Sequence, residues 1–147
     1  MNMQYDVAGF PSEHLHIIWH DLMPFLEKAL FFSDNEMATM HIYDALMNDT
    51  MQLWTASEGT TLKGIVVTEF IRFPNKLICH VVLVAGSMIG SWEHCLEKIE
   101  EWAIEEGATG MRAYARPGWK PKAKEHGYKM QYCIYTKAIG HSDENTH

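Results

Sequence analysis

Two side chains that can accept a proton interrupt apolar stretches of the sequence. Glu69 lies in VVTEF and His80 lies in ICHVV, and the flanking residues in both favour β-strands. A carboxylate and an imidazole are common general bases in enzymes. Strand alternation would also place Glu69 in water, and a lone histidine in a strand is often hydrogen-bonded in the core or exposed. Both residues therefore stand as candidate bases, and the sequence does not choose between them.

A second candidate is the stretch GSMIGS (86–91), which follows an apolar run and precedes a helical pattern from about Trp92. The first turn of a helix offers backbone N–H groups and a positive dipole end to a phosphate. Gly86 and Gly90 would let the backbone come close to that phosphate, although a plain strand-to-helix turn uses glycine for the same conformational reason. If a phosphate binds here, a bulky residue at either glycine should abolish binding and leave the fold largely intact.

Positive charge is concentrated near the C-terminal end of an acidic chain. The net charge is −7, yet seven of the 12 Lys and Arg residues lie between 112 and 137, and six glutamates lie just upstream, between 93 and 106. Such a cluster can attract an anion locally, and it can equally be one solvated face. Arg116 and Trp119 flank a Pro-Gly turn, where they could clamp an anionic or planar ligand or simply pack the next helix. The seven cations are Arg112, Arg116, Lys120, Lys122, Lys124, Lys129 and Lys137.

Other chemistries find less support. His16 and His20 are one helical turn apart, but no third ligand follows at a known spacing, so no metal is expected. Three widely spaced cysteines form neither a disulfide framework nor a zinc knuckle. The acidic charge argues against broad nucleic-acid binding. No apolar run is long enough for a bilayer and no signal peptide is evident, so we expect no membrane association and a cytoplasmic protein.

Periodicity predicts a mixed α/β domain over residues 1–140, followed by a disordered tail at 141–147. Short turns between three successive strands favour antiparallel pairing, and a later strand–helix–strand unit adds a crossover. The expected helices cover 12–32, 34–49, 91–107 and 119–126, and the expected strands cover 3–7, 51–56, 62–73, 76–86, 109–115 and 128–139.

Two stretches in this order resemble the GNAT superfamily of acyl-CoA-dependent N-acyltransferases. They are HVVLVAGSMIGSWEHCLEKIEEWAIEEGA (80–108) and YARPGWKPKAKEHGYKMQYCIYTKAI (114–139). The resemblance implies a GNAT-like mixed, mostly antiparallel α/β sheet with flanking helices and a splayed pair of parallel strands. RPGW, the later GY and the closing strand that ends near a lysine also resemble small GNAT-like proteins of tailed phages and prophages.

By this resemblance the co-substrate is acetyl-CoA, with its pantetheine arm between the splayed strands and its 3′-phosphate near the lysine cluster. Tyr114 or Tyr128 could donate the proton to the leaving thiolate, and the sequence does not choose between them. The chain departs from the family pattern in two ways: Ala123 stands where many relatives have the donor tyrosine, and the glycine loop lacks the usual Arg or Gln. The residues expected to hold acetyl-CoA are Leu83, Val84, Ala85, Gly86, Ser87, Gly90, Ser91, Arg116, Trp119, Lys120 and Lys122.

Two functions follow from the resemblance. The first is an acetyl-CoA-dependent N-acetyltransferase that acts by direct transfer to an amine of a small molecule or a protein. The alternative is a catalytically weak or inactive GNAT-fold protein that serves a phage as an interaction or virion-associated module. A homodimer and a phage or host protein partner are both left open, and the place of action would be the host cytoplasm.

Overall fold

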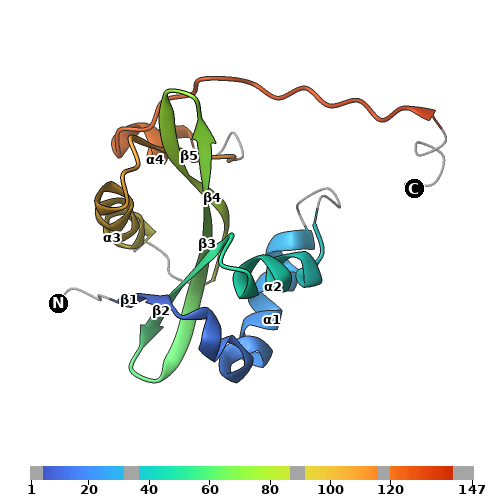
Figure 1. Cartoon of the computed structure of the whole chain (residues 1–147), viewed down its shortest axis with the longest axis vertical. Helices are drawn as coiled ribbons and strands as arrows, with labels where there is room; N and C mark the ends of the chain where they lie inside the picture. Colours follow the sequence, from blue (N-terminus) through green and yellow to red (C-terminus); the bar gives the residue numbers. More distant parts are fainter. Residues whose placement is uncertain (1–4, 32–36, 87–91, 116–119, 141–147) are drawn as a thin grey trace. The chain divides into compact units, whose positions relative to one another are not determined.

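The computed structural model describes residues 5–31, 37–86, 92–115 and 120–140 of the chain. The chain divides into two units, Met1–Tyr114 and Ala115–His147. The first unit holds the sheet and the helices α1, α2 and α3, and the second holds α4 at Lys120–Glu125 (Figure 1). The predicted single domain over 1–140 stays a prediction, and the predicted tail at 141–147 lies outside the described residues.

The sheet has five strands in the order β1-β2-β3-β4-β5. The first four strands pair antiparallel with their neighbours, and β5 alone runs parallel to its neighbour, β4. This arrangement confirms the predicted fold class of a mostly antiparallel α/β sheet with one parallel pair. The strands are β1 (Asp6–Phe10), β2 (Gln52–Glu58), β3 (Thr61–Phe73), β4 (Lys76–Gly86) and β5 (Gly110–Ala113).

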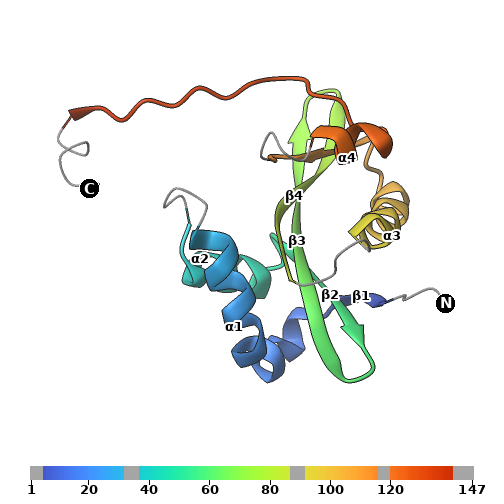
Figure 2. The same ribbon diagram turned by 180° about the vertical axis from the view of Figure 1, so that it is seen from behind.

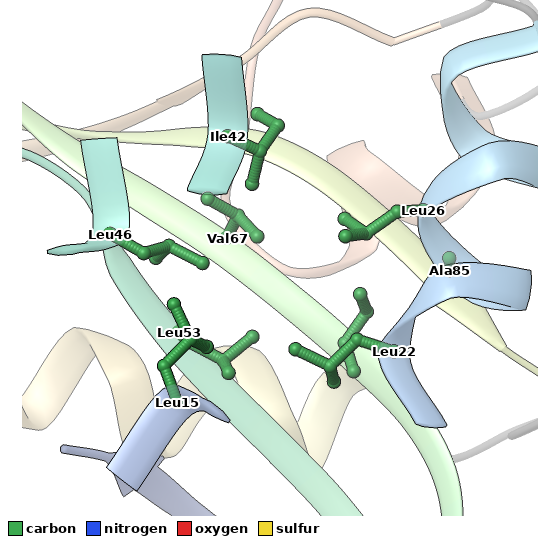
Figure 3. Packing of buried hydrophobic residues seen from close by; sticks show 9 residues of the cluster. Leu15, Leu22, Leu26, Ile42, Leu46, Leu53, Val67 and Ala85 are labelled. Carbon is green, nitrogen blue, oxygen red and sulfur yellow. The ribbon is translucent and has the colours of Figure 1, made fainter. Parts of the chain in front are cut away.

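Helices cover both faces of the sheet. A short 3-10 turn, η1 (Ser12–His14), leads into α1 (Leu15–Phe31), which lies with α2 (Thr39–Met47) on one face, while α3 (Trp92–Glu105) lies on the other (Figure 2). Leucines at helical spacing on α1 point toward the strands, as Figure 3 shows for Leu22 and Leu26. The α1/α2 face is held by a buried apolar cluster, which consists of Leu15, Leu22, Leu26, Ile42, Leu46, Leu53, Ile65, Val67 and Ala85.

The opposite face is closed by α3, whose Ile99 and Ala103 pack against Trp54, Val66 and Cys79 on the strands. These side chains are removed from water, which is the main favourable contribution to folding. Burial raises the pKa of the Cys79 thiol to about 11, and a hydrogen bond with Thr68 acts in the opposite direction. A thiol in that state is not a nucleophile near neutral pH, so Cys79 is a core residue.

Three details of the sequence prediction were wrong. The first strand runs on to Phe10 instead of ending at Val7, and α2 covers only Thr39–Met47 of the range expected to be helical. The predicted starts of these two elements, at 3 and 34, lie outside the described residues. The predicted strand at 128–139 belongs to the second unit, where these residues form no regular secondary structure. Its alternating pattern suits a strand, but alternation alone does not supply the hydrogen-bonding partner that makes one.

Candidate active site

The strands β4 and β5 lie side by side only over the first half of β4. Ile78 to Val81 pair with Gly110 to Ala113, and β4 then continues to Gly86 paired only with β3 among the described strands. The parting point coincides with an irregularity in the pairing with β3. Val67 pairs with Leu83 and Thr68 with Val81, so Val82 between them has no partner. A bulge of this kind bends the strand and is common beside active sites.

The three predicted catalytic residues meet at this parting point. Glu69 on β3 and His80 on β4 are direct cross-strand partners, so their side chains leave the same face of the sheet. The ring of Tyr114, just beyond β5, meets the His80 ring edge-on with centroids 4.8 Å apart. His80 is only 6% exposed, whereas Tyr114 is 64% exposed and can present its hydroxyl to a ligand. Their catalytic roles stay predictions, but the fold gathers the three from distant parts of the sequence.

The surroundings of this cluster shift the pKa values of His80 and Glu69. Burial lowers the pKa of His80, the positive charge of Arg112 lowers it further, and a hydrogen bond with the Arg112 backbone acts in the opposite direction. Burial raises the pKa of the half-buried Glu69 carboxyl. The imidazole is therefore neutral near pH 7 and able to accept a proton. Its Nδ1 is buried and has no hydrogen-bond partner within the described structure, which is unusual for a buried polar atom.

Sequence reasoning missed Arg112 as a member of this site. Arg112 pairs with His80 in the parallel register, and its guanidinium lies over the Phe73 ring, 5.1 Å from the centroid. The available signal was its spacing from Tyr114, because residues two apart on a strand share a face. In the sequence, Arg112 stands out only as one of the seven cations between 112 and 137.

Comparison with known proteins supports the fold but gives no sequence relative. No protein-family model and no curated protein sequence matches the chain. An aminoglycoside acetyltransferase from an uncultured soil metagenomic sample, solved with sisomicin, matches with a TM-score of 0.70 at 11% identity, over 92% of this chain and 97% of that one. A ribosomal-protein-alanine N-acetyltransferase from Brucella melitensis biovar Abortus 2308 matches with a TM-score of 0.69 at 12% identity, over 91% and 99%.

A predicted acetyltransferase from Clostridium acetobutylicum, solved with acetyl-CoA, also matches, with a TM-score of 0.64 at 12% identity over 95% of this chain and 97% of that one. The fold is that of the GNAT acetyltransferases. At these identities the likeness establishes the architecture, and the activity has to be argued from the residues.

The GNAT-like fold places the predicted pantetheine residues on the free part of β4. Leu83 and Ala85 belong to the α1/α2 side of the core, and Val84 packs toward α3. Gly86 ends the strand opposite Gly64, and its φ of 140° is one that L side chains rarely adopt. A Cβ at Gly86 would collide with the backbone of Lys63 and Gly64. The expectation that a larger residue at Gly86 would leave the fold intact is therefore wrong.

Other predicted ligand residues fall on or beyond the edge of the described structure. Ser87, Gly90, Ser91, Arg116 and Trp119 lie outside the described residues. Lys120 and Lys122 begin α4 in the second unit, and their part in binding stays a prediction.

The Gly-Tyr pair that contributed to the resemblance has a local explanation. Tyr128 N–H donates to the Ala123 carbonyl at 2.9 Å, Gly127 N–H donates to the Lys124 carbonyl at 3.1 Å, and Gly127 has a φ of 86°. This is the hydrogen-bonding pattern that ends a helix at a glycine. The pair therefore terminates α4, whatever else it does.

Two further observations concern metal and membrane. Among the described residues, no three His, Cys, Asp or Glu side chains are grouped so that they could hold a metal ion. No helix in the described part of the chain has the length and apolar character needed to span a bilayer.

Proposed function

We propose that the protein is an acetyl-CoA-dependent N-acetyltransferase. The observation that carries this proposal is the meeting of Glu69, His80 and Tyr114 where β4 parts from β5. Acetyl transfer to an amine requires a base, a polarised thioester carbonyl and a proton for the leaving thiolate. The cluster offers a neutral imidazole, a carboxylate and an exposed phenol beside a strand with free backbone groups.

The free part of β4 suits a ligand that carries amides. Beyond Val81, β4 has no strand partner on its β5 side in the described structure, so backbone N–H and C=O groups there can pair with an extended ligand. Acetyl-CoA carries two amides in its pantetheine arm and would supply the acetyl thioester. Leu83, Val84 and Ala85 would hold that arm, and the residues that follow Gly86 in the sequence would meet the pyrophosphate.

The residues of this chain then divide the proton transfers between them. His80 accepts a proton from the acceptor amine as the amine nitrogen bonds to the acetyl carbon and the carbon–sulfur bond breaks. Tyr114 donates its phenolic proton to the departing sulfur and regains one from water. Glu69, one strand away, attracts the cationic form of the amine to the site, where the amine gives up its extra proton to water before the neutral nitrogen attacks.

The acceptor class can be tested first with two amines chosen from the structurally similar proteins. An aminoglycoside such as sisomicin represents small molecules, and a peptide with an N-terminal alanine represents proteins. Release of free CoA thiol above the rate without acceptor, with a matching acetylated product by mass spectrometry, is the expected result. Absence of acetylated product with these and with a broad amine panel would count against the enzyme.

The pKa of His80 gives a prediction for pH dependence. The folded-state pKa lies below the ordinary value of 6.5, so the unfolded chain binds the proton more readily as pH falls below that value. The His80 imidazole therefore leaves the free energy of unfolding unchanged above pH 6.5. It lowers that free energy as pH falls from 6.5 toward the pKa of His80 in the folded protein. An NMR titration of the imidazole C–H signals should place the His80 midpoint below 6.5. A midpoint at or above 6.5 would contradict a neutral, buried base.

An interaction module remains the second candidate, because the second unit exposes a run of apolar side chains. Met130, Tyr132, Ile134 and Tyr135 are between 63% and 92% exposed. Exposed apolar groups of this number often mark a surface that another protein covers. A phage protein with such a role, without transfer activity, would bind a partner through this segment and show no acetylated product in the assay above.

A further inference from the structure

A cavity of about 320 Å³ lies at the other edge of the sheet, where β2 begins. Its lining includes Phe10, at the end of β1, and Ser12, at the start of η1. It also includes Asp49 and Met51, which lie between α2 and β2. Its size falls within the range of small-molecule sites. None of the residues proposed for acetyl transfer lines it, so it is a separate feature of the molecule.

Aromatic rings form the apolar part of this cavity. Trp54 from β2 and Trp102 from α3 meet edge-on with centroids 5.0 Å apart, and Phe10 lies on the same lining. Trp102 also contacts Phe70, with 5.2 Å between the ring centroids. Rings fixed by such contacts present flat, electron-rich surfaces, which suit another ring or an organic cation.

A hydrogen-bonded chain fixes the polar side of the cavity. Trp54 Nε1–H donates to Thr68 Oγ1 at 3.0 Å, and the Thr68 hydroxyl donates to Gln52 Oε1 at 2.9 Å. Trp54 and Thr68 are both buried, so the chain holds the indole ring in one orientation. Because its oxygen accepts from Thr68, Gln52 has its amide N–H₂ left to donate to a guest.

Asp49 brings a negative charge to the rim. It follows α2 with a φ of 58°, and its N–H donates to the Leu46 carbonyl at 3.2 Å while Thr50 N–H donates to the Ala45 carbonyl at 2.9 Å. This is a glycine-type helix end in which the usual glycine is replaced by an aspartate. These bonds fix the backbone of Asp49, an exposed residue that lines the cavity.

We propose that this cavity binds an aromatic amine in its cationic form, with the ring against Trp54 and Trp102 and the ammonium group at Asp49. The acidic chain, with a net charge of −7, favours the approach of a cation over that of an anion. The site does not depend on acetyl transfer, so it can be tested without acetyl-CoA.

The test titrates the full-length protein with tryptamine and, separately, with indole-3-ethanol, which has the same ring but no charge. Binding is followed through the indole N–H signals in ¹H–¹⁵N NMR spectra, where Trp54 is distinguished by its hydrogen bond to Thr68. We expect the Trp54 and Trp102 signals to shift, and tryptamine to bind about tenfold more tightly than the neutral alcohol.

Three variants separate charge from shape and from folding. Asp49→Asn tolerates the same backbone conformation, and should weaken tryptamine about tenfold while leaving the alcohol unchanged. Asp49→Gly should act in the same way, and because glycine suits this position it should leave the melting temperature unchanged or higher. The control, Asp44→Asn, changes an exposed aspartate on α2 that does not line the cavity, and should have no effect. Equal affinity for the two ligands, an unaffected Asp49→Asn variant, or shifts confined to other tryptophans would overturn the proposal.

Discussion

Replacing His80 with glutamine should lower the rate constant for acetyl transfer by about 10²–10⁴-fold, the usual contribution of a general base. Glutamine has a similar size and keeps a polar end, but it cannot accept the proton from the amine. Affinity for acetyl-CoA should change little, because the proposed binding groups lie farther along β4. The measurement is steady-state kinetics with the best acceptor from the amine panel, together with calorimetry for acetyl-CoA.

His16→Gln is a matched control for this variant, because His16 is exposed on α1 and lies outside the cluster.

Glu69→Gln should have a smaller effect on the rate constant, and mainly raise KM for cationic acceptors. If His80→Gln keeps the full rate while Glu69→Gln loses it, the two roles are reversed. If neither variant loses activity, the cluster is not the catalytic centre.

Replacing Gly86 with alanine should destabilise the fold by about 3 kcal/mol or more. The added Cβ meets the backbone of Gly64 and Lys63 on β3, and backbone cannot move aside as a flexible side chain can. The φ of 140° adds strain for any L residue. For a protein of this size we expect a fall in melting temperature of about 6 °C or more.

Gly59→Ala provides the comparison, since Gly59 also has a positive φ, of 62°, but a Cβ there meets nothing within 4 Å. It should lower stability by about 1–2 kcal/mol through backbone strain alone. Thermal unfolding of both variants measures the difference. A Gly86→Ala protein as stable as Gly59→Ala would show that the β3–β4 pairing at Gly64 and Gly86 is looser than described.

The sequence was sufficient for most of the architecture because strand and helix periods are local. The alternation of apolar residues from Met51 to Gly86 and the helical spacing of Ile99 and Ala103 identify their elements without tertiary information. The segment at 128–139 shows the limit of that reasoning. Its alternation is as regular as that of β2, but a strand requires a partner, and the partner is a tertiary property.

The candidate site was only partly predictable for a related reason. Glu69 and His80 are conspicuous as polar residues in apolar strands, but their direct pairing depends on the register of β3 and β4, including the unpaired Val82. The contact between His80 and Tyr114 further depends on the parallel alignment of β4 and β5, which an entire helix separates in sequence. The sequence identifies Arg112 only as a positive charge, and the parallel pairing of β4 with β5 is what places it beside His80.

In the sequence, Gly86 fits either a phosphate-binding turn or a close approach between two backbone segments. Its position before a helix favoured a phosphate loop, whereas the structure gives it a packing role in the sheet. A phosphate site formed by the residues after Gly86 is compatible with that role, but substitution at Gly86 cannot reveal it. Backbone signals of β4 are a better reporter, because they can be observed in the unmodified protein.

The most direct test of the account is therefore a titration of ¹⁵N-labelled protein with acetyl-CoA, followed by the backbone amide signals of β4. We predict saturable shifts of the Val82, Leu83, Val84 and Ala85 amides, with smaller changes at the β1 and β2 edge of the sheet. An absence of shifts at millimolar acetyl-CoA, or shifts that leave the amides beyond Val81 unchanged, would contradict the proposed binding of acetyl-CoA where β4 parts from β5.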